Sequence, residues 1–170
     1  KHLTENFEGH INPTEVIANL ICEKESFVSG IENVFENIKG SCSLLVLTEE
    51  GIIAARDKLG RTPVVVGKKE GARAVASETC AFPNTGFETE YYLGPGEIVI
   101  VSHNGIRQLK KPGDKMQICS FLWVYYGYPP SDYEGINVDE CRYRCGAALA
   151  RRDFVEADFV CGIPDSGVGH

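Results

Sequence analysis

The sequence predicts an α+β fold with a mostly antiparallel sheet, followed by the start of an α/β domain. Residues 12–40 carry apolar side chains at helical spacing, whereas residues 41–109 change to short apolar runs divided by tight turns. A helical pattern over 138–152 then leads into the apolar run 157–163, which indicates a buried strand. With 170 residues, 43% of them hydrophobic, the chain can form one domain and part of a second.

Two helices are expected near the N-terminal end. Asn12 is a good N-cap, Pro13 suits the first helical position, and Glu15 stands at the capping-box position relative to Asn12. The second helix is expected from about Gly30 to a stop at Gly40. The apolar stripes of the two helices are Val16, Ile17, Leu20 and Ile21, then Ile31, Val34, Phe35 and Ile38.

The strands that follow are expected to form an antiparallel meander with turns of a few residues. Their predicted ranges are 41–48, 51–56, 64–67 and 73–77, followed by 97–102 and 106–109 after a loop. Asn104-Gly105 lies between the last two, and this dipeptide is a strong signal for a hairpin turn.

Charge and composition exclude several classes of protein. The formal net charge of −7 disfavours binding to nucleic acid or to a membrane surface, because both need basic patches. No apolar run has the length of a membrane span, and the first residues show no signal-peptide pattern. The seven cysteines are odd in number and lack framework spacing, which indicates reduced thiols and a cytoplasmic protein.

Five motifs in order carry a resemblance to a known family. Residues 56–63 (RDKLGRTP), 76–78 (ASE) and 94–97 (GPGE) resemble the rear part of an N-terminal nucleophile hydrolase domain, the class II glutamine amidotransferase fold. Residues 119–146 resemble the linker of the amidophosphoribosyltransferase family, and 158–167 resemble the first strand and loop of its phosphoribosyltransferase domain.

The resemblance implies an organisation and a reaction. Residues 1–112 correspond to part of the glutamine amidotransferase domain, 113–137 to the interdomain linker and 138–170 to the start of the phosphoribosyltransferase domain. Family members release ammonia from glutamine and use it to displace pyrophosphate from phosphoribosyl pyrophosphate (PRPP), which gives phosphoribosylamine for purine synthesis. The partners implied for the parent enzyme are therefore glutamine and PRPP, with Mg²⁺ as cofactor.

The sequence departs from the family at its beginning. Family members use an N-terminal cysteine as nucleophile with its own α-amino group as base, whereas residue 1 is Lys1, so no catalytic residue is assigned. Where the family has an aspartate that holds the α-amino group of glutamine, this sequence has Pro13. We therefore expect a fragment that is inactive by itself and that forms a homo-oligomer through incompletely covered sheets.

Three residues near the end are predicted to bind substrate. By position, Asp165, Ser166 and Gly167 match the family's first PRPP-binding loop, and Ser166 matches a residue near Mg²⁺. Cys119 stands where some members have the first ligand of an iron–sulfur cluster. One thiolate does not hold a cluster, so a buried structural cysteine is the favoured interpretation.

Other polar candidates are interpreted as structural. Asp57 and Arg61 flank a tight turn and are expected to stabilise it as a pair, although a catalytic carboxylate is the alternative. Glu78 is expected to have a structural role, with a place near the active edge of the sheet as the alternative. The aromatic block 121–128 is expected to form interface core rather than to stack a base.

The remaining cysteines are also expected to be structural. Cys141 and Cys145 share a helix face, but no histidine or further cysteine pair completes a tetrahedral metal site, so helix packing is favoured. Four cysteines lie in apolar runs and are predicted to be core residues: Cys22, Cys42, Cys80 and Cys161.

Two further functional hypotheses stay open at this point. The chain is alternatively a degenerate, non-catalytic binding or assembly module, since its acidic charge and intact linker permit such a role. A class II amidotransferase acting on sugars or aspartate is the third hypothesis, and the strand and loop over 158–167 argue against it.

Overall fold

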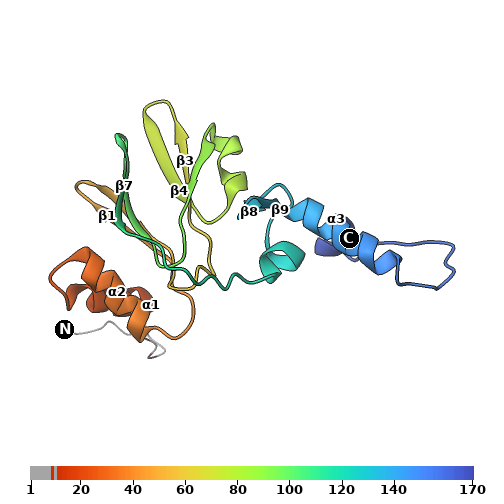
Figure 1. The fold of residues 1–170 in the computed structure, drawn as a ribbon, viewed down its shortest axis with the longest axis horizontal. Coiled ribbons are helices and arrows are strands. Elements are labelled where there is room, and N and C mark those ends of the chain that lie inside the picture. The colour runs from red at the N-terminus through yellow and green to blue at the C-terminus, as the bar shows by residue number, and fades with distance from the viewer. Residues whose placement is uncertain (1–8, 10) are drawn as a thin grey trace. The chain divides into compact units, whose positions relative to one another are not determined.

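A computed structural model describes residue 9 and residues 11–170 (Figure 1). The chain divides into two compact units. Among the described residues, the first combines 9 and 11–62 with 93–117, and the second combines 63–92 with 118–170. Helices accompany sheets in which every strand pair is antiparallel, which confirms the predicted α+β class and the antiparallel character of its first part.

The two N-terminal helices are α1 (Pro13–Cys22) and α2 (Phe27–Asn37). The predicted cap of α1 is confirmed, because the Asn12 side chain accepts a hydrogen bond from the Thr14 N–H at 3.0 Å. The predicted start of α2 was three residues late. Ser26 and Ser29 form a reciprocal capping box there, which satisfies N–H groups that the first turn leaves unpaired.

The first unit also contains a four-stranded sheet of order β1-β2-β6-β7. Its strands are β1 (Leu44–Thr48), β2 (Gly51–Ala55), β6 (Ile98–Ser102) and β7 (Gly105–Lys110). The register places Ile53 opposite Ile100 and Ala55 opposite Ile98. These four residues and Ile31 of α2 form one buried cluster, so the helices cover this face of the sheet (Figure 1).

The second unit contains a separate sheet of order β4-β3-β5. Its strands are β3 (Val65–Lys69), β4 (Ala72–Ala76) and β5 (Glu88–Tyr92), with the short turns η1 (Thr79–Ala81) and η2 (Pro83–Thr85) before β5. The prediction of one continuous meander was therefore wrong. β2 pairs with β6 rather than with β3, and β5, which the alternating polar residues of 88–92 concealed, completes the second sheet.

The rest of the second unit is built around one helix. After the π-helical turn η3 (Leu122–Tyr126) come β8 (Asp132–Tyr133), β9 (Ile136–Asn137), α3 (Val138–Ala150) and the 3₁₀ turn η4 (Ser166–Gly169). The Asn137 side chain caps α3 by accepting from the Glu140 N–H at 3.0 Å. Trp123, Tyr133 and Val138 form the local core, with the two rings edge-to-face at 5.8 Å.

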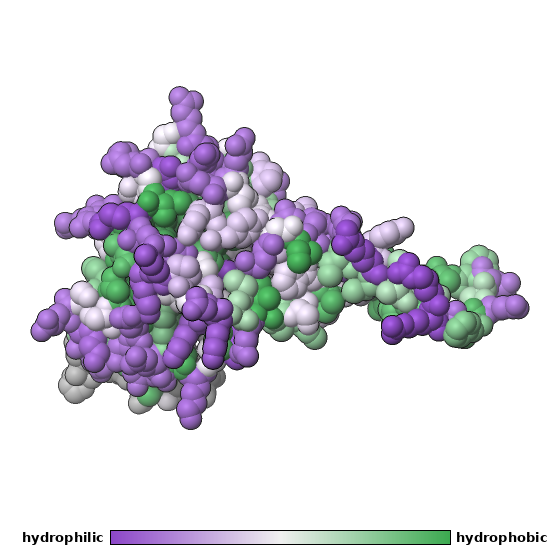
Figure 2. All heavy atoms as spheres, viewed as in Figure 1, coloured by the Kyte–Doolittle hydropathy of each residue, from purple (hydrophilic) through white to green (hydrophobic). Residues whose placement is uncertain are grey.

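The predicted buried strand at 157–163 was wrong. These residues form no strand, and Phe159 and Val160 are 93% and 92% exposed. A strand is stable only when its N–H and C=O groups pair with a neighbour, and no described strand lies against this segment. Apolar side chains are visible on the segment that follows α3, at the right of Figure 2.

Candidate functional site

A hollow of about 500 Å³ in the second unit brings together two segments that lie far apart in the sequence. One wall comes from the aromatic block and α3, and the other comes from the loop that begins η4. The lining residues are Tyr125, Tyr126, Gly127, Tyr128, Pro129, Arg142, Pro164, Asp165 and Ser166. Of the three residues predicted to bind substrate, the structure therefore places Asp165 and Ser166 in this hollow.

The aromatic block forms the first wall because its side chains divide between core and surface. Trp123 is buried and donates from its indole N–H to the Ile136 carbonyl at 3.0 Å. Tyr125, Tyr126 and Tyr128 are each about two-thirds exposed (64, 69 and 65%). The prediction that the whole block is interface core was therefore wrong for these three tyrosines, which line the hollow.

Arg142 connects α3 to this wall, and the sequence reasoning assigned it no role. Its side chain is 3% exposed and donates to the backbone carbonyls of Trp123 at 2.9 Å, Tyr125 at 3.0 Å and Gly127 at 2.8 Å. Arginine is rarely buried without a partner. The available signal was its position on the inner face of a predicted helix, one residue after Cys141.

The second wall is the short turn that contains the predicted substrate residues. The Gly167 N–H donates to the Ile163 carbonyl at 3.1 Å, and the His170 ring nitrogen Nδ1 lies 3.0 Å from the Ser166 carbonyl. Gly167 itself does not line the hollow. The turn approaches α3 closely, since a Cβ at Gly169 would lie 3.3 Å from the Cβ of Arg142.

The side-chain atoms of Asp165 and Ser166 that could bind a metal ion at the hollow are oxygens. The Asp165 carboxylate and the Ser166 hydroxyl are of the kind that Mg²⁺ prefers. No three His, Cys, Asp or Glu residues gather to hold a metal ion anywhere in residues 9 and 11–170. A Mg²⁺ ion here would therefore need most of its ligands from a bound phosphate compound and from water.

The Asp57 carboxylate organises a turn in the first unit. It is buried and accepts hydrogen bonds from the N–H groups of Leu59 at 3.1 Å and Thr62 at 2.9 Å. The predicted partner Arg61 instead donates to the Gln117 side chain at 3.5 Å. The turn-stabilising role of Asp57 is thus observed, but the pairing with Arg61 was wrong because backbone N–H groups occupy the carboxylate.

Two further buried charged residues serve the backbone of the first unit. Arg56 is fully buried and donates to the carbonyls of Leu93 at 2.5 Å and Gly60 at 2.7 Å. The Glu97 carboxylate accepts from the Gly94 N–H at 2.7 Å. Such bonds compensate for the burial of a charge and fix loops, which is a structural task.

Glu78 also has structural partners. Its carboxylate accepts from the Ser131 hydroxyl at 3.0 Å, and the neighbouring Thr79 hydroxyl accepts from the Asp132 N–H at 2.7 Å. These bonds join the end of β4 to β8 within the second unit. Burial, together with the nearby Glu78 carboxylate, raises the pKa of the Tyr133 hydroxyl, so Tyr133 stays protonated at neutral pH.

The cysteines differ from the predictions in their exposure. All seven are free, but Cys22, Cys119 and Cys161 are exposed, because each lies at the end of an element or in a loop instead of in the core. Cys42 and Cys80 are half-buried. Cys119 was predicted to be a buried structural cysteine but is exposed, and it belongs to no group of three potential metal ligands within the described residues.

Cys141 and Cys145 lie one turn apart on α3 and are both half-buried. Burial raises the pKa of the Cys141 thiol, and the neighbouring Cys145 raises it further. A thiol whose pKa is raised is a poor nucleophile and a poor metal ligand at neutral pH. The helix-packing interpretation agrees with this environment.

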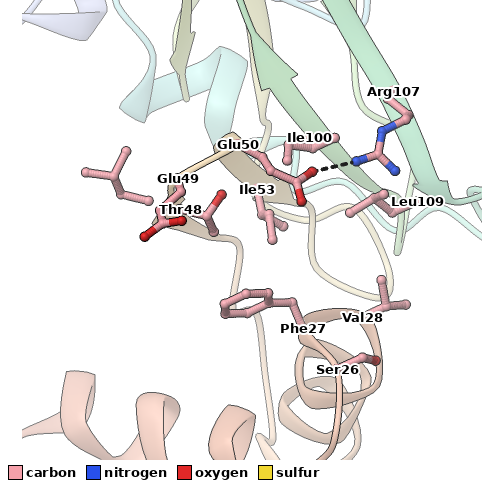
Figure 3. Close-up of a pocket in the computed structure, with 11 residues that line it drawn as sticks. Ser26, Phe27, Val28, Thr48, Glu49, Glu50, Ile53, Ile100, Arg107 and Leu109 are labelled. Atoms are coloured by element: carbon pink, nitrogen blue, oxygen red, sulfur yellow. Dashed lines mark hydrogen bonds and ion pairs between the residues drawn. The ribbon is translucent and has the colours of Figure 1, made fainter.

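A second hollow, of about 570 Å³, lies in the first unit between the start of α2 and the sheet (Figure 3). Phe27 and Val28 border it on the helix side, and Ile53, Ile100 and Leu109 border it on the sheet side. The only ion pair drawn there joins Glu50 to Arg107 at 2.9 Å on the exposed rim. This hollow is mainly apolar and contains none of the predicted site residues.

No helix within the described residues is long and apolar enough to cross a membrane.

Comparison with known proteins identifies relatives over most of the chain. Residues 2–84 match the family described as "Glutamine amidotransferase domain". The amidophosphoribosyltransferase of Bacillus subtilis is 37% identical over 158 residues, which cover 91% of this chain and 33% of the relative. The chloroplastic amidophosphoribosyltransferase of Vigna aconitifolia is 39% identical over 159 residues, covering 91% of this chain and 33% of the relative.

A solved structure agrees with these relatives. The glutamine PRPP amidotransferase of B. subtilis, complexed with ADP and GMP, superposes with a TM-score of 0.83 at 35% identity. The match covers 95% of this chain and 37% of that one. The chain spans about a third of the length of the curated relatives it matches. By sequence and by structure, therefore, this chain is similar to part of the amidophosphoribosyltransferases.

Proposed function

We propose that the chain supplies the rear of the glutamine amidotransferase domain, the linker and the first part of the phosphoribosyltransferase domain of an amidophosphoribosyltransferase. The reaction is the glutamine-dependent amination of PRPP to phosphoribosylamine in purine synthesis. One observation carries the proposal. The match to the glutamine amidotransferase domain ends at residue 84, whereas the similarity to the amidophosphoribosyltransferase of B. subtilis extends over 91% of the chain.

The hollow at Asp165 and Ser166 supports a role in binding the pyrophosphate group of PRPP. The residues that line it carry one carboxylate, several hydroxyl groups and the guanidinium of Arg142, which donates to the Gly127 carbonyl at 2.8 Å. Mg²⁺ bound to pyrophosphate would use the Asp165 carboxylate and the Ser166 hydroxyl as oxygen ligands. Contact of Gly167 with substrate stays a prediction, because this residue does not line the hollow.

The chain is proposed to contribute part of the glutamine amidotransferase domain that releases ammonia from glutamine in this reaction. A cytoplasmic location is proposed with the same reaction, and the seven free cysteines support it.

The test is complementation of a bacterial strain that lacks amidophosphoribosyltransferase and needs added purine. The full reading frame that contains this chain is expected to restore growth without purine. The purified product is expected to release pyrophosphate from PRPP only when glutamine or ammonia is present. The same reading frame with Asp165→Asn and Ser166→Ala is expected to lose PRPP-dependent turnover while it still hydrolyses glutamine.

Pyrophosphate release that needs neither amine donor would contradict the proposal. A protein that hydrolyses glutamine at full rate but never uses PRPP would point instead to a different class II amidotransferase. The matched control is Arg144→Met, because the Arg144 side chain is 75% exposed and bonds only within its helix to Glu140. This control variant is expected to behave as the unmodified protein.

A further inference from the structure

Arg142 has an arrangement that a simple core residue does not need. Its guanidinium directs three hydrogen bonds of 2.8–3.0 Å at carbonyls of a single short segment, Trp123 to Gly127. The carbonyls of Tyr125 and Gly127 lie at the end of the π-helical turn η3 and at its C-cap, where carbonyl groups lack partners within the turn, and the carbonyl of Trp123 lies earlier in the turn. A buried cation at that end satisfies them and interacts favourably with their dipoles.

The same segment forms one wall of the hollow. Because Arg142 binds the carbonyls of Tyr125 and Gly127, it fixes the backbone from which Tyr125, Tyr126 and Tyr128 project. Gly127 lies close to its neighbours, since a Cβ there would be 2.5 Å from the Leu122 carbonyl oxygen and 2.6 Å from the Tyr133 ring. The Arg142 side chain thus helps to hold the position of the wall, together with the bond from the Gly127 N–H to the Leu122 carbonyl at 2.8 Å.

The opposite wall also depends on the helix that carries Arg142. The turn η4, which holds Ser166, packs against α3 at the position of Arg142, where Gly169 approaches the arginine Cβ. The distance between the tyrosines and Asp165–Ser166 is therefore set by α3 on both sides.

We propose that Arg142 is a positioning residue for the pyrophosphate site. It acts by holding the tyrosine wall at a fixed distance from Asp165 and Ser166, and it does not itself bind the ligand. This inference rests on the proposed function, because it takes the hollow to be the place where the pyrophosphate group of PRPP binds.

Lysine is the informative replacement. Arg142→Lys keeps the positive charge and most of the volume, but an ammonium group cannot reproduce the planar fork that reaches three carbonyls. If Arg142 is only a filler of the core, the lysine variant should bind ligand as the unmodified chain does. If Arg142 positions the wall, the lysine variant should bind more weakly although the protein stays folded.

The experiment measures the binding of magnesium pyrophosphate to the 170-residue chain by titration calorimetry. Trp123 is the only tryptophan in the chain and lies in the turn that Arg142 holds, so its fluorescence reports the position of the wall. We expect Arg142→Lys to bind about tenfold more weakly, the effect of one or two lost hydrogen bonds, with a red shift of Trp123 emission.

Two further variants separate the possible results. Ser166→Ala is expected to weaken binding without changing Trp123 emission, because it touches the ligand and not the wall. Arg144 lies two residues after Arg142 on the same helix and is exposed. Arg144→Met is therefore expected to change neither the affinity for magnesium pyrophosphate nor Trp123 emission. Far-ultraviolet circular dichroism at the titration temperature identifies any variant that has unfolded. If Arg142→Lys has unfolded, Arg142→Gln is used in its place.

Each outcome decides something. Unchanged affinity in a folded Arg142→Lys variant with shifted emission overturns the positioning role and leaves the pyrophosphate site standing. Absence of magnesium pyrophosphate binding by the unmodified chain overturns the site and the role together. Weakened binding with the emission shift, and neither change in Arg144→Met, supports the inference.

Discussion

The Asp57 carboxylate determines the path of the six residues from Asp57 to Thr62. It is 2% exposed and accepts from two backbone N–H groups, at Leu59 and Thr62, and from the Ser43 hydroxyl at 3.4 Å. These bonds replace the water that the carboxylate loses on burial, so the charge stabilises the loop instead of destabilising the fold.

Replacing Asp57 by alanine is expected to lower the free energy of unfolding by about 2 kcal/mol, because it leaves two part-buried N–H groups without their acceptor. Asp57→Asn should cost less, since it keeps one acceptor oxygen. Urea unfolding followed by circular dichroism measures both. Arg61→Ala in the same turn is the control and should change stability by no more than about 0.5 kcal/mol, because the side chain is exposed. An equal loss in all three variants would contradict this assignment.

The Arg73–Glu90 pair links β4 and β5 across β3 and makes stability depend on pH. Two hydrogen bonds, at 2.7 and 3.0 Å, join the guanidinium to the carboxylate. The Arg73 bond is the main cause that lowers the pKa of Glu90 below its ordinary value. A carboxylate with a lowered folded-state pKa stabilises the fold at pH values above its unfolded pKa of about 4.3, and this stabilisation is lost as the pH falls further.

Glu90→Gln should therefore flatten the decrease in stability between about pH 5 and pH 3. Thermal unfolding of both proteins at several pH values provides the comparison. At pH 7 the variant should be less stable than the unmodified chain, and the two curves should converge in acid. Glu50→Gln serves as the control because the Glu50–Arg107 pair is 73% and 65% exposed, and such pairs contribute little. Parallel curves for Glu90→Gln would refute the assignment.

At the scale of elements, α1 and α2 pack so closely that α2 requires a glycine at position 30, where it contacts α1. A Cβ at Gly30 would lie 2.5 Å from the Ile21 carbonyl oxygen and 2.9 Å from the Ile21 Cα. Both atoms belong to the backbone of α1, so the contact cannot be relieved by rotating a side chain. The sequence showed Gly30 only as an apparent helix start, because the position of the neighbouring helix is not a local property.

Two opposite effects act on a Gly30→Ala variant. Alanine favours the helix by about 1 kcal/mol relative to glycine, whereas overpacking against the backbone costs about 1–3 kcal/mol. We expect the steric effect to exceed the propensity and the variant to be less stable. Gly113→Ala is the matched control, since a Cβ there would meet only the Pro95 carbonyl oxygen at 3.7 Å. A stabilised Gly30→Ala variant in thermal unfolding would show that α1 moves freely.

The elements that could be predicted from the sequence are those that depend on near neighbours. The Asn12 cap, the Asn104-Gly105 turn between β6 and β7, and α3 followed from signals within a few residues. The pairing of β2 with β6 depends on residues more than forty positions apart, and no local pattern specifies it. The apolar run 157–163 was predicted as a strand from hydrophobicity alone, although a strand also needs a neighbour.

The candidate site likewise has a part that could be predicted from the sequence and a part that depends on the fold. Asp165 and Ser166 were predicted from the family resemblance, and they line the hollow. The tyrosines and Arg142 were not assigned to it, because only the folded turn η3 shows which aromatic side chains leave the core. Arg142 is more than twenty residues from Asp165 in sequence, and its carbonyl partners are invisible to any pattern of side chains.

At the scale of the whole molecule, the exposed edge of the first sheet predicts self-association. β1 is the terminal strand of its sheet in the described chain, and Leu45 and Leu47 on it are 52% and 84% exposed. An unpaired strand edge with apolar side chains readily pairs with another chain. The expected assembly is a homo-oligomer in which β1 of one copy pairs with β1 of another.

Leu47→Lys is expected to shift the isolated chain toward the monomer, because a charged side chain on an edge strand opposes pairing with a second edge. Sedimentation velocity over a range of protein concentrations measures the shift. Phe159→Lys is the matched comparison, since Phe159 is 93% exposed on the unpaired segment after α3. If Phe159→Lys dissociates the oligomer and Leu47→Lys does not, the 157–163 segment forms the contact and the sheet edge does not. A chain that is monomeric at every concentration would exclude both contacts.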